Sequence, residues 1–354
     1  MTTIYGQRET PCVLVDFDVA EANIDKFATY CKSKGIASRP HIKTHKLPVL
    51  AHRQVTAGAI GITCQKISEA EVMADAGIKD ILITYNIVGE AKLKRLLELS
   101  ARCELSVVAD SKTVIEGLAQ AFASADKPLD VLVECDTGAG RCGVQNAEQA
   151  VELATIINDK PGLMFNGLMT YPLNVDQSEI GDWLVDAKQK IEMTGVSCGQ
   201  ISSGGSPNMW RAHEVEGVTE HRAGTYVYYD YSMVSYGVCE ITDCALTVMA
   251  TIVSRPTDDR AIIDAGTKIL TSDQLGQKGF GHILEAPDAW LKELNEEHGI
   301  IDLCNTNWQP KIGDQIRIIP NHACVVSNMV DAIWVHRGDD VIGQEPVAAR
   351  GHVW

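Results

Sequence analysis

The 354-residue sequence lacks the features of membrane, secreted and nucleic-acid-binding proteins. No stretch approaches the roughly 18 uninterrupted apolar residues that cross a bilayer. The beginning of the chain carries Arg8 and Glu9 and no apolar run, so no secretory signal is expected. Lys and Arg number 31 against 47 Asp and Glu, which gives a net charge of −16. Nucleic acid and anionic lipid attract basic surfaces, so neither is expected as a partner.

The cysteines also lack a pattern that would indicate a zinc ribbon or a disulfide framework. There are 11 of them, an odd number, and none forms a Cys-x-x-Cys pair. This usage predicts a cytoplasmic protein with reduced thiols. Most of the thiols, including Cys31, Cys103 and Cys135, have apolar neighbours and are expected to be small core residues. The sequence contains no internal repeat and no low-complexity tract.

Short runs rich in Val, Ile and Leu alternate with longer amphipathic stretches over the first two thirds of the chain. This alternation is typical of parallel strands connected by helices. Eight such units predict a (β/α)8 barrel over residues 17–240, and an open doubly wound sheet is the alternative. The predicted strands are 37–43, 61–65, 80–85, 104–110, 130–136, 165–171, 199–204 and 218–224.

The pattern changes after about residue 245, where strand-like segments follow one another with turns and little helix between them. The segments 248–254, 261–264, 315–320 and 332–335 predict an antiparallel β domain. We expect this domain to comprise residues 241–354 together with 1–16. An early apolar run around Val13 would add a strand to it and tie the two ends of the chain together.

Polar residues gather at the carboxyl ends of the predicted barrel strands, which is where barrel enzymes place their chemistry. A purely structural barrel would not need them there. The candidates, in chain order, are His41, Lys43, Gln65, Arg141, Tyr171, Ser203, Gly204, Gly205, Ser206, Arg222, Gly224, Thr225 and Tyr226.

The loops after strands seven and eight are glycine-rich, and in barrels these two loops commonly bind a phosphate group through backbone N–H groups. A phosphate there and a lysine at the end of strand one together suggest a phosphorylated cofactor joined to Lys43 as a Schiff base. Burial or neighbouring cations would lower the pKa of this amine, and His41 and His45 are nearby in sequence. Two simpler interpretations stay open: Lys43 as a solvated surface lysine, and His41 as a core histidine bonded to a backbone carbonyl.

Four ordered motifs, Pro40-His-Ile-Lys-Thr-His-Lys46, Ser203-Gly-Gly-Ser-Pro207, Arg222-Ala-Gly-Thr-Tyr226 and Pro320-Asn-His-Ala-Cys324, carry a resemblance that covers nearly the whole chain. The sequence resembles the D-threonine aldolase and D-serine dehydratase group, which has the alanine racemase-like fold of pyridoxal-phosphate (PLP) enzymes and acts as a homodimer. The resemblance implies that Lys43 carries PLP and that the loops at 203–206 and 224–226 hold its phosphate. It places Arg141 at the phenolic oxygen of the cofactor, and Tyr171 or Arg222 at the ring nitrogen.

His322 and Cys324 are two positions apart, so in an extended strand they would face the same side and grip one cation. Imidazole and thiolate favour zinc or a similar metal, and manganese is the other candidate. The resemblance makes them the metal pair that binds the β-hydroxyl of the substrate. Two departures stand out, which together suggest a third subgroup. The aldolases generally carry His-x-Asp at the metal, so Cys324 resembles the dehydratase branch, and the segment 172–176 lacks the histidine-rich loop of both branches.

The function implied is a PLP- and metal-dependent lyase acting on D-3-hydroxy amino acids, with Lys43, His322 and Cys324 as catalytic residues. Retro-aldol cleavage to glycine and an aldehyde is favoured, since the overall resemblance is closer to the aldolases. The alternatives are a dehydratase of D-serine or D-3-hydroxyaspartate, an amino-acid racemase using Tyr228, Tyr229 or Tyr231, and a PLP-binding protein without catalysis. Glu69, Asp75 and Asp80 are expected to be solvated, and every cysteine except Cys324 is expected to serve packing.

Overall fold

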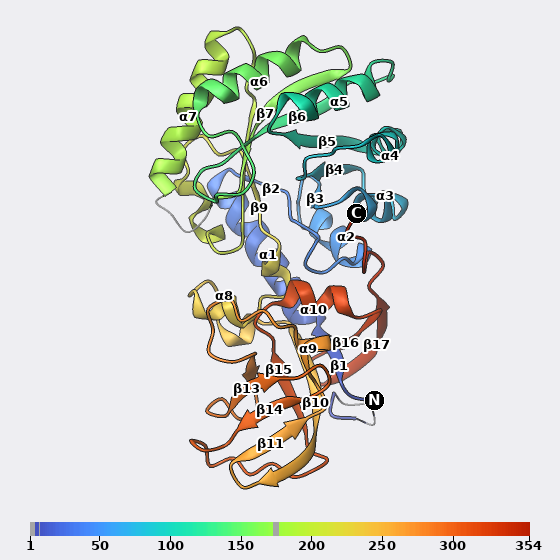
Figure 1. The fold of residues 1–354 in the computed structure, drawn as a ribbon, viewed down its shortest axis with the longest axis vertical. Coiled ribbons are helices and arrows are strands. Elements are labelled where there is room, and N and C mark those ends of the chain that lie inside the picture. The colour runs from blue at the N-terminus through green and yellow to red at the C-terminus, as the bar shows by residue number, and fades with distance from the viewer. Residues whose placement is uncertain (1–3, 7, 173–176) are drawn as a thin grey trace. The chain divides into compact units, whose positions relative to one another are not determined.

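The computed structural model describes residues 4–6, 8–172 and 177–354, and Figure 1 shows its fold. Most of the segment that departs from the family pattern, 173–176, lies outside the described residues. The chain divides into two compact units. One contains the residues up to Ile24, Thr44–Leu47 and Thr225–Gly351, and the other contains Asp25–Lys43, Pro48–Gly224 and His352–Trp354. Within the described part of the chain, no helix has both the length and the apolar character needed to cross a membrane.

Eight parallel strands form the sheet of the second unit, in the order β2-β9-β8-β7-β6-β5-β4-β3. The two edge strands meet just after β2, where His41 forms a parallel bridge with Thr63 and the N–H of Thr63 donates to the carbonyl of Pro40 at 2.7 Å. This closure confirms the predicted barrel over the open sheet. The strands are β2 (Ala37–Ser38), β3 (Ile62–Cys64), β4 (Asp80–Ile83), β5 (Glu104–Ala109), β6 (Leu129–Cys135), β7 (Leu163–Thr170), β8 (Gln200–Gly204) and β9 (Glu220–Arg222).

Helices alternate with the barrel strands, as the amphipathic patterns predict. The start of α6 illustrates the local cause, because the side chain of Asn146 accepts the N–H of Gln149 at 2.9 Å and caps the first turn. The helices are α1 (Phe17–Lys34), α2 (Pro48–Thr56), α3 (Ile67–Asp75), α4 (Glu90–Ser100), α5 (Lys112–Phe122), α6 (Ala147–Asp159), α7 (Gln177–Met193) and the short 3-10 helix η1 (Met209–Glu214).

The barrel interior is packed with apolar side chains. Leu82, Val108, Leu132 and Met169, from four consecutive strands, form one buried cluster. Side chains alternate along a strand, so Glu134 shares the inward face of β6 with Leu132 and lies one step nearer to the carboxyl end. The apolar core is therefore followed, at that end of the barrel, by a layer of polar side chains.

The first unit contains a second sheet, whose main path runs β13-β14-β11-β10-β1-β16-β17, with β15 pairing β10 and β12. The strand around Val13 joins this sheet as predicted, antiparallel to β10 and parallel to β16. Other pairings are antiparallel. The strands are β1 (Cys12–Asp16), β10 (Leu246–Thr257), β11 (Arg260–Ile263), β12 (His282–Ile283), β13 (Trp290–Leu294), β14 (Gly299–Asp302), β15 (Gln315–Ile319), β16 (Ala332–Arg337) and β17 (Asp340–Pro346).

Short helices connect the strands of this unit. They are η2 (Thr225–Val227), α8 (Tyr231–Ser235), η3 (Ile241–Asp243), α9 (Thr267–Leu270) and α10 (Ala323–Met329). The last of them begins within the predicted metal-binding motif.

The prediction for the cysteines is right for the buried thiols and wrong for two others. Cys31, Cys103 and Cys135 are buried, whereas Cys142 and Cys304 are exposed. Both exposed thiols lie in loops, one after β6 and one after β14, where apolar neighbours in sequence do not imply a core position.

Candidate active site

Lys43 lies half-buried a few residues after β2, where its backbone is held by His41. The N–H of Lys43 donates to Nδ1 of His41 at 3.3 Å, and Nε2 of His41 lies 3.1 Å from Oε1 of Gln65. Gln65 donates from Nε2 to the carbonyl of Thr84 at 2.9 Å, so its Oε1 accepts a hydrogen bond from Nε2 of His41. His41 is therefore neutral, with its hydrogen on Nε2. It orients the backbone of the lysine and adds no positive charge beside the amine.

The amine of Lys43 has no hydrogen-bond or ion-pair partner among the residues that the structure describes, and is available to form a bond. The neighbouring Gln65 is fixed from a second side, because its N–H donates to Oε2 of Glu69 at 2.8 Å. Glu69 is only 2 % exposed, so the expectation that it is solvated is wrong. It lies in the first turn of α3, and its carboxylate folds back onto the end of β3.

The two glycine-rich loops at the ends of β8 and β9 are joined by hydrogen bonds. Oγ of Ser206 accepts the N–H of Gly224 at 3.2 Å, and the N–H of Gly205 donates to the carbonyl of Arg222 at 3.2 Å. His221 adds a third link, since its Nε2 lies 3.0 Å from the carbonyl oxygen of Gly205. The two loops thus form one structure.

Glycine is required at two positions of the 203–206 loop. Gly205 has φ +120°, and a Cβ there would lie 3.3 Å from the ring of Tyr171. A Cβ on Gly204 would lie 2.8 Å from Nη2 of Arg222. Side chains at positions 204 and 205 would therefore collide with Arg222 and Tyr171. Glycine at both positions lets a phosphate group approach the backbone of the loop closely.

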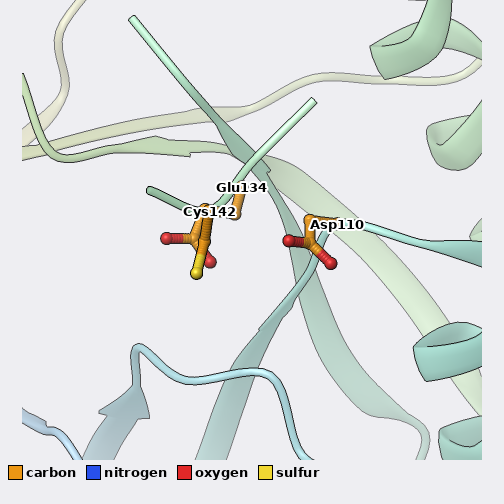
Figure 2. A group of neighbouring side chains, drawn as sticks. All are labelled: Asp110, Glu134 and Cys142. Carbon is orange, nitrogen blue, oxygen red and sulfur yellow. The ribbon is translucent and has the colours of Figure 1, made fainter. Parts of the chain in front are cut away.

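Arg141 and Tyr171 come together from the loops after β6 and β7. The guanidinium of Arg141 lies 4.9 Å from the centre of the Tyr171 ring. Asp136 fixes the loop that carries Arg141, because its Oδ1 accepts hydrogen bonds from the N–H groups of Gly138 and Gly140 at 3.0 Å each. Figure 2 shows a further group of side chains beside this loop, Asp110, Glu134 and Cys142.

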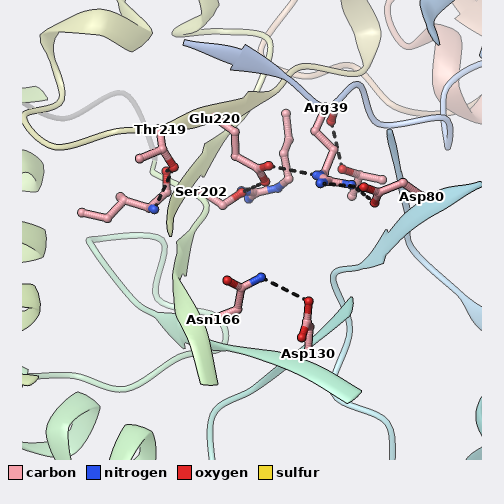
Figure 3. A network of polar contacts seen from close by, with 10 residues as sticks. Arg39, Asp80, Asp130, Asn166, Ser202, Thr219 and Glu220 are labelled. Carbon is pink, nitrogen blue, oxygen red and sulfur yellow. Dashed lines mark hydrogen bonds and ion pairs between the residues drawn. The ribbon is translucent and has the colours of Figure 1, made fainter. Parts of the chain in front are cut away.

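Arg222 is held by a chain of buried polar contacts inside the barrel. Figure 3 shows its neighbours Ser202, Glu220 and Arg39. Arg222 donates to Oγ of Ser202 and, at 2.8 Å, to the carbonyl of Thr170. Ser202 donates to one carboxylate oxygen of Glu220, and the other accepts from Nε of Arg39 at 2.9 Å. Burial lowers the pKa of Arg222 to about 10, although Glu220 acts in the opposite direction. The guanidinium thus stays charged and fixed at neutral pH.

The same network continues from Arg39 to Asp80, whose carboxylate pairs with the guanidinium. The side chain of Asp80 is 39 % exposed and so remains in contact with solvent as expected, but it begins β4 and pairs with Arg39. A Cβ on Gly61 would lie 2.6 Å from Nη1 of Arg39, so the arginine fills the space that this glycine leaves. The sequence interpretation did not single out Arg39 and Glu220, which lie inside the predicted strands 37–43 and 218–224 and not at their carboxyl ends.

His322 and Cys324 lie at the start of α10, and the prediction of an extended strand is wrong. His322 directly precedes the helix and Cys324 is its second residue. The cause is Asp230, whose Oδ2 accepts the N–H of Ala323 at 3.0 Å and anchors the first turn. The two side chains nevertheless meet. Burial lowers the pKa of His322, but a hydrogen bond with Cys324 and another with Asp273 outweigh it and raise that pKa to about 9.

Two hydroxyl groups surround the thiol of Cys324. Oγ1 of Thr44 lies 3.1 Å from its Sγ, and Oγ1 of Thr225 lies 3.6 Å away. Thr225 begins η2, and the following Tyr226 is buried with 1 % exposure. Nδ1 of His322 lies 2.7 Å from Oδ2 of Asp273, a contact that the sequence interpretation missed because no motif marks this aspartate.

These donor sets fit the two groups that the sequence implies. An uncommitted amine, two linked loops with glycine where a side chain would not fit, and two arginines suit a phosphorylated, anionic cofactor. An imidazole and a thiol in contact, flanked by hydroxyls, suit a borderline divalent metal with open positions for water or substrate.

Comparisons with known proteins give the same picture. The alanine racemase N-terminal domain model matches residues 15–232, and the serine dehydratase domain model matches residues 245–336. The D-threonine aldolase of Arthrobacter sp. is 33 % identical over 97 % of this chain and 93 % of its own length. The D-threo-3-hydroxyaspartate dehydratase of Delftia sp. (strain HT23) is 30 % identical over 98 % of both chains.

Solved structures agree with these relatives. The D-threonine aldolase from Filomicrobium marinum superposes with a TM-score of 0.88 at 32 % identity, covering 98 % of this chain and 96 % of the other. A D-threo-3-hydroxyaspartate dehydratase in a metal-free form superposes with a TM-score of 0.87 at 29 % identity, covering 98 % and 99 %. That form carries a cysteine-to-alanine substitution, and another structure of the enzyme carries a histidine-to-alanine substitution two positions earlier.

Proposed function

Because this chain belongs to the alanine racemase-like family that includes the D-threonine aldolases and the D-3-hydroxyaspartate dehydratases, we propose that it is a PLP- and divalent-metal-dependent lyase acting on D-3-hydroxy amino acids. The observation that carries the proposal is the contact between Thr44 and Cys324 at 3.1 Å. Thr44 directly follows Lys43 in the chain, so the residue next to the proposed cofactor lysine touches the proposed metal ligand.

The residues around Lys43 have distinct proposed roles. Lys43 binds the cofactor through its amine, with its backbone oriented by His41 and, through His41, by Gln65. The glycine-rich loops at 203–206 and 224–226 hold the phosphate group, since their backbone leaves room for it beside Gly204 and Gly205. Arg141 binds the phenolic oxygen. When bound, PLP supplies an electron sink for negative charge at Cα, and the metal lowers the pKa of a coordinated hydroxyl.

The ring nitrogen of the cofactor is assigned to Arg222, with Tyr171 as the second candidate. Arg222 is fixed by Ser202 and Thr170 and does not donate a proton readily, since its pKa is still about 10. A pyridine that faces an arginine stays unprotonated and withdraws less charge from Cα. More of the stabilisation must then come from the metal that His322 and Cys324 hold.

Aldol cleavage is our first proposal for the reaction. His322 and Cys324 would hold the cation, which would lower the pKa of the β-hydroxyl of the substrate and so favour cleavage of the Cα–Cβ bond to glycine and an aldehyde. The support is the similarity to the Arthrobacter D-threonine aldolase over nearly the full length of both chains.

Dehydration is the second candidate, and Cys324 favours it. A histidine and a cysteine two positions apart are the residues substituted in the structures of the related dehydratase, and the cysteine variant is the metal-free form. In this reaction Lys43 removes the proton from Cα and the β-hydroxyl departs, which gives a 2-oxo acid and ammonia. Aldolase and dehydratase therefore need the same residues.

Product analysis distinguishes the two reactions. The purified protein with PLP and zinc is incubated with D-threonine, D-serine and D-3-hydroxyaspartate, and glycine, 2-oxo acids and ammonia are quantified. Glycine with an aldehyde from D-threonine supports the aldolase, whereas ammonia and a 2-oxo acid without glycine contradict it and support the dehydratase. Absence of turnover with all three substrates, together with the visible absorbance of the Schiff base, would leave a PLP-binding protein without catalysis.

The metal requirement is tested separately by chelation. We expect zinc to restore activity better than manganese after dialysis against a chelator, because imidazole and thiolate are softer ligands than manganese prefers. If activity survives exhaustive chelation, the reaction does not need a metal, and the proposed role of His322 and Cys324 as metal ligands in catalysis is wrong.

Two of the three tyrosines named for a racemase do not suit that role, which leaves Tyr231, stacked on His282, as the one candidate among them. Tyr228 and Tyr229 are 0 % and 1 % exposed, and burial raises the pKa of both hydroxyls, so neither suits a base for a substrate. We further propose a cytosolic homodimer, in keeping with the family and with the unpaired cysteines. Light scattering on the purified protein tests the dimer.

A further inference from the structure

Glu134 is a buried carboxylate that lacks a partner. It lies on the inward face of β6 with 5 % exposure, and it forms no hydrogen bond or ion pair through its side chain within the described part of the chain. Burial and the nearby Asp110 raise the pKa of this carboxyl to about 7, while Arg141 and Arg222 act in the opposite direction without pairing with it. A buried carboxylate is normally matched by hydrogen bonds or by a counter-charge, and this one is not.

Two further ligand groups converge on Glu134 (Figure 2). Asp110 directly follows β5 and Cys142 lies in the loop after β6, and one ligand atom from each of the three residues lies within 4.8 Å of the others. Asp110 also forms no ion pair among the described residues. Three groups that carry negative charge when deprotonated are thus gathered without a paired cation.

The loop that brings Cys142 to this place is fixed. The N–H of Gly143 donates to Oδ2 of Asp110 at 3.2 Å, and the N–H of Val144 donates to the carbonyl of Glu134 at 2.9 Å. Gly143 has φ +117°, and a Cβ there would lie 2.4 Å from the backbone nitrogen of Asp136. The chain therefore turns tightly beside Glu134, and this turn holds Cys142 next to Asp110 and Glu134.

We propose that Asp110, Glu134 and Cys142 form a second divalent-cation site, suited to zinc or an ion of similar chemistry. Carboxylate oxygens at about 2.0–2.2 Å and thiolate sulfur at about 2.3 Å are the ligands and distances that zinc adopts, with water in the fourth position. The ion supplies the positive counter-charge that the buried carboxylate of Glu134 lacks. The site shares no ligand with the His322–Cys324 pair and does not depend on the proposed lyase activity.

Cobalt(II) titration of a H322A/C324A double variant of the full chain tests this site, since the other proposed metal pair is then absent. A cysteine ligand gives a sulfur-to-cobalt charge-transfer band. We expect one equivalent of Co²⁺ to produce this band, C142S to abolish it, and E134Q to weaken binding by at least about tenfold, the loss that even supporting residues of metal sites cause. C304S is the matched control, because Cys304 is also an exposed loop thiol beside an aspartate, and it should keep the band.

A second measurement uses the unsubstituted chain. Zinc should slow the alkylation of Cys142, followed by mass spectrometry of the peptides, and leave the rate at Cys304 unchanged. Equal alkylation rates at Cys142 with and without zinc, a cobalt band that persists in C142S, or binding unaffected by E134Q would each overturn the proposal. None of these readouts involves turnover or PLP, so a failure here is distinct from a failure of the proposed function.

Discussion

Nδ1 of His322 lies 2.7 Å from Oδ2 of Asp273, a carboxylate from the loop after α9. The histidine therefore donates its Nδ1 hydrogen to the carboxylate and keeps Nε2 for another partner. Histidines that ligate metals are commonly oriented by such a carboxylate, which fixes the tautomer and makes the ligating nitrogen more basic. Asp273 is thus a supporting residue for the proposed metal pair, although it is not a ligand itself.

Replacing Asp273 with asparagine should weaken metal binding by about 10–100-fold, the usual loss for a residue that orients a metal-binding histidine. The fold should be little affected, since the aspartate side chain is 41 % exposed. Zinc affinity is measured by competition with a chromophoric chelator. D259N, which changes an exposed aspartate in the turn between β10 and β11, should bind zinc like the parent. Parental affinity in D273N would contradict the proposed orientation.

Replacing Lys43 with arginine should abolish the visible Schiff-base absorbance after addition of PLP, because a guanidinium does not form this bond. Turnover should fall by at least ~10³-fold, as when a covalent group is removed from an active site. K66R is the control, since Lys66 follows the neighbouring β3 and its amine lies 3.5 Å from the centre of the Tyr85 ring. If the absorbance is retained in K43R and lost in K66R, the cofactor is bound to Lys66 and not to Lys43.

The architecture was predictable because its signals are local. Alternating apolar residues mark the eight barrel strands, and the short apolar run at Val13 marks the strand that joins β10 and β16. The start of α10 was not predictable in this way. It depends on Asp230, which is distant in sequence and accepts the N–H of Ala323. His-x-Cys suits a strand and a helix start equally well until that contact is known.

The candidate site was partly predictable for the same reason. Residues after the barrel strands, such as Lys43 and Arg141, can be found by counting strands, since a barrel brings all of these ends together. The buried polar residues that contact one another across neighbouring strands cannot be found by counting strands. Arg39 and Glu220 stabilise Arg222 through contacts that join β2, β8 and β9, and a single sequence does not reveal which polar side chains of neighbouring strands face each other.

Replacing Arg39 with methionine should destabilise the protein by about 3 kcal/mol, because it leaves Glu220 buried without its counter-charge. The two side chains are 8 % and 1 % exposed. R102M removes an arginine from an exposed pair with Asp75 and should cost at most about 1 kcal/mol. Urea unfolding measures both variants. An equal, small effect of both substitutions would show that the buried pair contributes no more than a surface pair.

His221 should make the protein acid-sensitive. It is 1 % exposed, its Nε2 hydrogen bonds to Gly205, and its Nδ1 is buried without a partner among the described residues. Burial lowers the pKa of this imidazole from 6.5 to about 4. Between these values the unfolded chain binds a proton that the folded chain does not, so His221 lowers the free energy of unfolding as the pH falls through this window. The full effect is about 3 kcal/mol.

The comparison of wild type with H221Q isolates this contribution, because glutamine does not titrate and its amide can still donate to Gly205. Both proteins contain Glu134, so its contribution to the pH dependence cancels in the difference. The raised pKa of Glu134, about 7, means that the folded chain binds a proton that the unfolded chain does not, which opposes the effect of His221 in the same pH window. We expect wild type to lose about 3 kcal/mol relative to H221Q between neutral pH and about pH 4 in urea unfolding. H298Q, at an exposed histidine, is the control. A difference between wild type and H221Q that stays constant with pH would mean that His221 has the same pKa in the folded and the unfolded chain, and would contradict the lowered pKa.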